Sequence, residues 1–102
     1  MTTRTEYDPT ADALYIYLER SVIFGLLEAM EAAARPRVAQ SIVVDEGRVV
    51  DLDDQGQPVG IEVLGASTGV HLTDIIDRFN LFEFKADLQT VERTTFRPAA
   101  AG

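Results

Sequence analysis

Apolar residues recur along the chain at two different spacings, and each spacing predicts one kind of element. Over residues 13–18, ALYIYL, they alternate, so that Leu14, Ile16 and Leu18 fall on one side and two tyrosines on the other. Period-two alternation is typical of a β-strand. Both sides of this strand are apolar, so we expect each to pack against another part of the protein.

The spacing changes to a helical one over residues 22–35. Apolar residues then recur every three or four positions, and Pro36 ends the segment, since the residue before a proline avoids the helical region. The helix is rich in apolar residues for an insertion between strands. We expect it to cover either its own sheet or a neighbouring chain, through Ile23, Leu26, Leu27 and Met30.

Three more strands are predicted, over residues 38–44, 49–52 and 59–64, with a glycine-containing turn after each of the first two. The first turn places Asp45 opposite Arg48. In the second hairpin, the predicted register sets Val50 opposite Ile61, Leu52 opposite Val59 and Val49 opposite Glu62. A slip of one residue would bury the carboxylate of Asp51, so the pattern selects the register.

A second helix is predicted over residues 73–80, and the following LFEFK favours a short edge strand or extended segment. The predicted fold class is α+β. It comprises a small antiparallel β-meander of about four strands, a helix inserted between the first two long strands, and a second helix after the sheet. Residues 1–84 form the predicted domain, and residues 85–102 form a C-terminal tail that we expect to be mobile.

Charge narrows the possible partners. Nine basic and seventeen acidic residues give a net charge of −8, which disfavours nucleic acid and anionic membranes. The longest apolar run has six residues, far too few to span a bilayer, and the chain has no cysteine. We therefore expect a soluble, cytoplasmic protein whose partner is a second copy or a basic protein.

The acidic stretch 51–62, DLDDQGQPVGIE, matches several ligand positions of a twelve-residue calcium loop. Strands are predicted on both sides of it, however, and Pro58 occupies a position where the calcium loop needs an apolar residue. A solvated acidic turn is the favoured interpretation. The alternative is a divalent-metal site, or a metal-assisted hydrolase, that uses Asp51, Asp53 and Glu62.

The remaining residues provide little further chemistry. His71 is the only histidine, Ser67 has no predicted base beside it, and the glycine-rich stretch 65–69 lacks the lysine of a phosphate-binding loop. No cofactor is expected. Tyr15 and Tyr17 could bind a small ligand against the sheet, although core or interface packing is the simpler interpretation.

Two stretches, YDPTADALYIYL over residues 7–18 and VVDLDDQGQPVGIEVLGAS over residues 49–67, resemble the bacterial family called domain of unknown function 2283. The matching residues are Tyr7, Asp8, Ala11–Ile16, Asp51, Asp53, Gly56 and Val59–Glu62. The resemblance implies a small antiparallel β-meander with a helix packed on it, and it implies no activity. Some relatives are encoded beside small toxin-like proteins, which implies a partner role similar to that of an antitoxin.

These observations favour a non-enzymatic module that associates with itself or binds a basic protein, with an antitoxin-like role as one form. A metal-dependent function of the acidic hairpin and a small-ligand site at the two tyrosines remain as alternatives.

Overall fold

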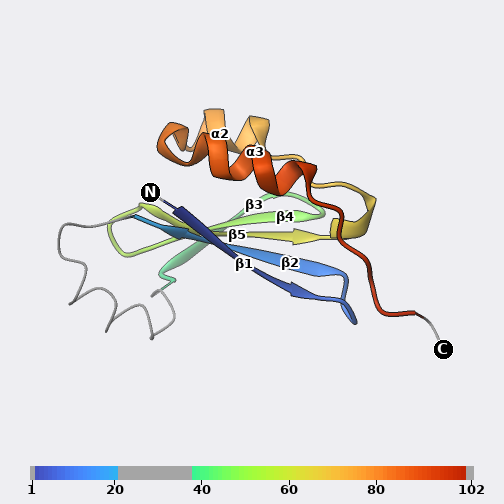
Figure 1. Cartoon of the computed structure of the whole chain (residues 1–102). Helices are drawn as coiled ribbons and strands as arrows, with labels where there is room; N and C mark the ends of the chain where they lie inside the picture. The colour runs from blue at the N-terminus through green and yellow to red at the C-terminus, as the bar shows by residue number, and fades with distance from the viewer. Residues whose placement is uncertain (1, 21–37, 101–102) are drawn as a thin grey trace, which may run out of the picture.

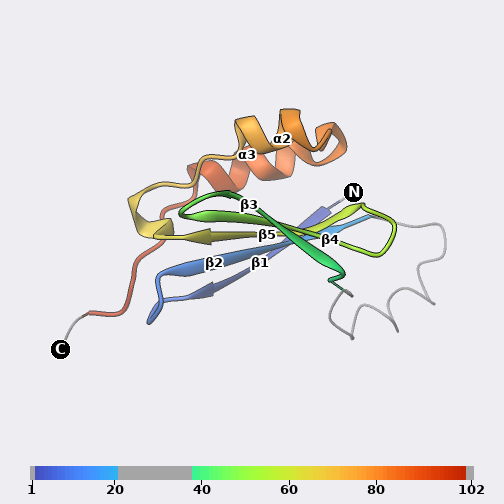
Figure 2. The ribbon, with the colours of Figure 1, turned by 180° about the vertical axis from the view of Figure 1, so that it is seen from behind.

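The computed structural model describes residues 2–20 and 38–100. Over these ranges the chain forms a five-stranded antiparallel sheet with the strand order β1-β2-β5-β4-β3 (Figure 1). The strands are β1 (Thr2–Asp8), β2 (Ala13–Glu19), β3 (Gln40–Asp45), β4 (Arg48–Leu52) and β5 (Pro58–Leu64). β1 faces the viewer in Figure 1, and β3 faces the viewer in the reverse view (Figure 2).

β3, β4 and β5 form the predicted meander, and β5 also pairs with β2. The predicted pairs Val50–Ile61, Val49–Glu62 and Asp45–Arg48 are confirmed. Leu52 lies opposite Pro58, one residue from the predicted partner, because the register shifts after Asp51. The alternation of apolar and acidic positions thus selects the register of the hairpin, and the local irregularity displaces only its end.

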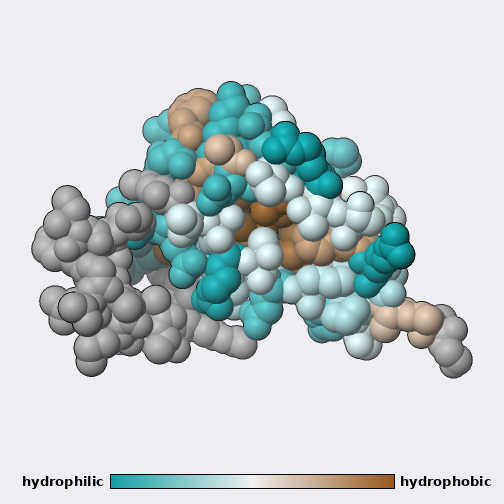
Figure 3. Space-filling model, in the orientation of Figure 1, coloured by the Kyte–Doolittle hydropathy of each residue, from teal (hydrophilic) through white to brown (hydrophobic). Residues whose placement is uncertain are grey.

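Two helices lie together on one face of the sheet (Figures 1 and 2). They are α2 (Thr73–Arg78) and α3 (Lys85–Arg93), and the 3-10 turns η1 (Ala66–Thr68) and η2 (Phe82–Phe84) precede them. The core fills the space between these helices and the sheet. Figure 3 shows it as a strip of apolar atoms between the two layers. Its most deeply buried side chains are Leu14, Ile16, Val50, Ile61, Leu72, Ile75, Leu81, Phe84 and Leu88.

The structure corrects the predicted fold in three places. The sheet has five strands and not four, because β1 pairs along its full length with β2. Both described helices follow the sheet. The segment LFEFK is not a strand: it forms η2 and leads into α3, which occupies the first half of the predicted tail.

The predicted helix over 22–35, with its candidate interface residues Ile23, Leu26, Leu27 and Met30, lies outside the described residues. Within residues 2–20 and 38–100, no helix is long and apolar enough to cross a membrane.

Candidate functional site

The face of the sheet opposite α2 and α3 is strongly acidic. Because side chains alternate along a strand and cross-strand partners point the same way, the register places five carboxylates on this face and one guanidinium. We call this surface the acidic face. Its charged residues are Arg4, Glu6, Asp8, Glu19, Asp51 and Glu62, and they surround Tyr15 and Tyr17.

Tyr15 lies across the sheet and joins four strands. Its ring crosses Gly60, so closely that a Cβ atom at that position would overlap the phenol. Its hydroxyl donates to Oδ2 of Asp51 at 2.7 Å, and the hydroxyl of Ser41 donates to Oδ1 of Asp51, also at 2.7 Å. Burial and the hydrogen bond to Asp51 raise the pKa of Tyr15 above its ordinary value, so it remains a neutral donor.

Tyr17 packs beside Tyr15, with 4.7 Å between the ring centroids. The guanidinium carbon of Arg4 lies 4.0 Å from the centroid of the Tyr17 ring, which is a cation–π arrangement. The Tyr17 hydroxyl donates to Oε2 of Glu6 at 2.7 Å. Arg4 also approaches Glu19 at 3.8 Å, so the single cation of the acidic face is already held by neighbours.

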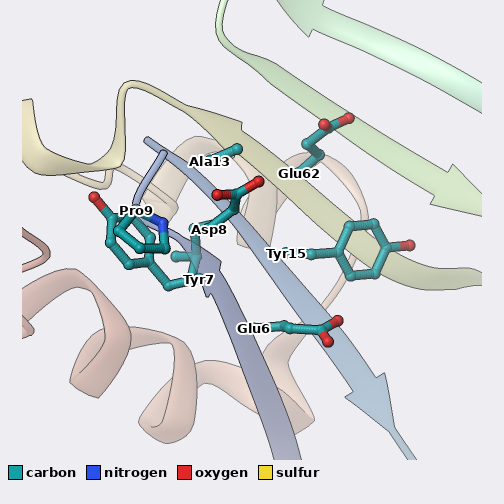
Figure 4. A pocket seen from close by; sticks show the side chains of 8 residues that line it. Glu6, Tyr7, Asp8, Pro9, Ala13, Tyr15 and Glu62 are labelled. Atoms are coloured by element: carbon teal, nitrogen blue, oxygen red, sulfur yellow. The ribbon is translucent and has the colours of Figure 1, made fainter. Parts of the chain in front are cut away.

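An open hollow of about 470 Å³ lies beside Tyr15 on the acidic face. Figure 4 shows the carboxylates of Glu6, Asp8 and Glu62 around it, the first two from β1 and the third from β5. Glu6 accepts the Tyr17 hydroxyl, and Asp8 accepts the N–H groups of the turn that follows it. Glu62 is half-buried and has no hydrogen bond or ion pair with any residue in the described ranges. Its charge is therefore the one at this hollow that lacks a described partner.

A second polar cluster, centred on Asp12, joins the β1–β2 hairpin to the end of β5. The Tyr7 hydroxyl donates to Oδ1 of Asp12 at 2.6 Å, and both the N–H and the hydroxyl of Ser67 donate to the same carboxylate. The hydrogen bonds from Ser67 and Tyr7 lower the pKa of Asp12. Burial, together with the hydrogen bond to Asp12, raises the pKa of Tyr7 to about 12. These hydrogen bonds tie the β1–β2 hairpin to the end of β5.

Arg48 connects the β3–β4 hairpin to α2. Its guanidinium donates to Oδ2 of Asp45 at 2.7 Å, to Oδ1 of Asp74 at 2.6 Å and to the backbone carbonyl of His71 at 2.9 Å. The hydrogen bond from Arg48 lowers the pKa of Asp45 and that of Asp74. Sequence reasoning predicted the pair with Asp45, but the contacts with α2 depend on the tertiary fold.

The three residues of the alternative metal site do not converge. Asp51 accepts hydrogen bonds from Tyr15 and Ser41, while Oδ1 of Asp53 accepts the N–H groups of Gln55 and Gln57 within its own turn. Glu62 pairs with Val49 inside the sheet. Across residues 2–20 and 38–100, no group of three or more Asp, Glu, His or Cys residues could hold a metal ion.

Several residues of these clusters were not predicted. Glu6 was not predicted, because β1 is almost entirely polar and has no alternation of apolar residues that would indicate a strand. Asp12 and Ser67 are 55 residues apart, and nothing local connects them.

The sequence profile of one family, described as "Protein of unknown function (DUF2283)", matches residues 4–67. No curated protein and no solved structure matches the chain. The match begins inside β1, covers β2, β3, β4 and β5, and ends inside η1, before α2 and α3.

Proposed function

This chain belongs to the DUF2283 family of proteins of unknown function, and we propose that it is a non-enzymatic interaction module that binds a basic protein partner on its acidic face. The observation that carries the proposal is the half-buried carboxylate of Glu62. It lies beside Tyr15 at an open hollow and has no partner within the described residues.

The polar residues shared with the family divide into two groups. Tyr7, Asp12, Tyr15, Asp51 and Asp53 all take part in hydrogen bonds that hold strands or turns together. Those interactions account for these residues without any ligand. Glu62 belongs to the same motif, and no hydrogen bond within the described residues accounts for its charge, so we take it as the carboxylate available for binding.

The chemistry of the hollow favours a lysine or arginine side chain. An incoming cation would meet Glu62, Glu6 and Asp8, together with the Tyr15 ring that forms one wall. Carboxylates attract the charge, while an aromatic ring accommodates the aliphatic stem and the cation. With five carboxylates against one guanidinium, this face would also steer a basic partner during its approach.

An antitoxin-like role is one form of this function, in which the bound partner is a small basic toxin. The net charge of −8 supports it, because a toxin that acts on nucleic acid carries a basic surface. We expect such a partner in the cytoplasm.

The test is a titration of the ¹⁵N-labelled full chain with a lysine- and arginine-rich peptide, followed by backbone chemical shifts. We expect the largest shifts at Tyr15, Glu62 and Glu6, and an affinity that falls as salt is added. Glu62→Gln removes the charge but keeps the shape, and it should weaken binding about two- to fivefold.

Glu83→Gln is the matched control, because Glu83 is exposed on η2, on the helical side of the sheet. It should bind the peptide like the wild type. If both variants lose the same affinity, or if the shifts spread evenly over the surface, the attraction is a general effect of net charge and the proposed site is wrong. If only Glu62→Gln weakens binding, mass spectrometry of the proteins that the wild type enriches over Glu62→Gln would identify the natural partner.

A further inference from the structure

The two edges of the sheet are protected to different degrees. At the β1 edge, the N–H of Thr3 donates to Oδ2 of Asp87 in α3 at 3.1 Å. The C-terminal segment follows the same side, where the N–H of Ala99 donates to the carbonyl of Pro9 at 2.8 Å. The charged side chains of Arg4 and Glu6 extend from this strand as well. Covered backbone and charge are the usual means by which proteins prevent strands from pairing at an edge.

Within residues 2–20 and 38–100, no backbone group of another element covers the outer side of β3, and its one charged side chain is paired. Gln40–Asp45 contains no lysine and no proline, and its side chains alternate between exposed and half-buried. Val43 is 68% exposed, the largest exposed fraction among the large apolar residues of the described chain. The only charge in the strand, Asp45, is neutralised by Arg48 at 2.7 Å. This edge is therefore nearly neutral in a strongly acidic protein.

We propose that β3 is a self-association site, at which the β3 strands of two copies pair antiparallel and form one continuous ten-stranded sheet. A second copy fits this edge better than a basic partner does, because the strand offers no unpaired negative charge. Two copies would repel each other through their acidic faces, but not through β3. The proposal is independent of the binding proposed for the acidic face.

The geometry of β3 limits the extent of pairing. The register with β4 shifts between Val43 and Asp45, and such a bulge bends a strand away from a straight partner. We therefore place the contact along residues 40–43, about a twofold axis beside Ile42. So short a contact buries less than the ~1,200 Å² of a stable interface, so the dimer should be weak and reversible.

Nitroxide labels provide a direct test, because the chain has no cysteine and a single introduced one is labelled specifically. Val43→Cys places a label at the β3 edge, and Thr5→Cys places one at the middle of β1. In the ten-stranded sheet, labels at 43 should lie within about 20 Å of each other. Labels at 5 would be separated by nine strand spacings, about 40 Å.

Sedimentation velocity supplies the second arm. The mean mass of the wild type should rise between about 10 µM and 1 mM. Val43→Lys should raise the dissociation constant at least tenfold, and Thr5→Lys, with the same charge change on the other edge, by less than twofold. A wild type that stays monomeric at 1 mM, a short distance between labels at 5, or equal effects of the two lysines would each overturn the proposal.

Discussion

Replacing Gly60 by alanine should displace the Tyr15 ring from the acidic face. The backbone of Gly60 is not in the left-handed region, so the need for glycine arises from the ring above it and not from φ. The added methyl group would overlap the hydroxyl and the adjoining ring carbons of Tyr15. The ring must then swing away, and the hydrogen bond to Asp51 is lost with it.

The expected loss in the free energy of unfolding follows from the contacts that Gly60→Ala removes. A hydrogen bond to a half-exposed carboxylate contributes about 1 kcal/mol, and re-exposing part of the ring costs about another 1 kcal/mol. Alanine recovers about 0.4–1 kcal/mol by restricting the unfolded chain. We therefore expect Gly60→Ala to lower the free energy of unfolding by about 1–2 kcal/mol.

Urea unfolding at 25 °C measures the change, and a double-mutant cycle identifies its cause. In the Tyr15→Ala background the methyl group has no ring to meet, so Gly60→Ala should be neutral or slightly stabilising. Gly47→Ala is the control, because a Cβ atom there would lie 3.5 Å from its nearest neighbour, an ordinary contact. If Gly60→Ala costs the same with and without the tyrosine ring, the close approach is not the reason for the glycine.

Three other changes test the structural clusters. Asp12→Asn removes a carboxylate whose pKa is lowered in the fold, and asparagine tolerates the positive φ at this position. The lowered pKa stabilises the protein above the unfolded value near 3.9, so the melting-temperature gap between wild type and Asp12→Asn should shrink as pH falls from 6 to 2. Arg48→Met should cost about 1–2 kcal/mol in urea unfolding, since it keeps the stem but breaks the link to α2; a neutral result would contradict that link. Asp53→Ala should cost about 1 kcal/mol through the turn, and calorimetry with Mn²⁺ should give the same response for the variant as for the wild type.

Strand positions and pairing were predicted most accurately from the sequence where one face of a strand is buried. Between residues 49 and 64 a slip of one residue would have buried Asp51, so the alternation, together with the turn, specified the pairing of Val50 with Ile61. β1 was not predicted, because burial of its side chains is not what stabilises it. Tyr7 is its only apolar side chain, and the strand forms because its backbone pairs with β2, an interaction that leaves little trace in hydropathy.

α3 was missed for a related reason. Only Leu88 and Val91 are buried within its nine residues, too few for a periodic signal. The helix is stabilised by the layer of side chains beneath it, which the sequence does not display.

At the candidate site, the residue types were visible in the sequence, but their contacts depend on residues that are distant in sequence. Asp51 and Glu62 were recognised as carboxylates of an acidic hairpin, but their environments differ for reasons that are remote in sequence. The partner of Asp51 is Tyr15, 36 residues away, and this contact explains Asp51 as part of the fold. Glu62 became the better candidate for binding only once the structure showed which carboxylates already have partners.

The stretch of chain that matches the family is shorter than the stretch that forms the hydrophobic core. Of the seventeen buried apolar side chains among residues 2–20 and 38–100, eight come from residues after 67, beyond the stretch that the family shares. A fragment that ends at residue 67 would keep every motif residue. It would expose the apolar face of the sheet to water, and we expect it to aggregate instead of folding. Expression trials or gene fusions designed around the homologous stretch should therefore carry the chain at least to Arg93, where α3 ends.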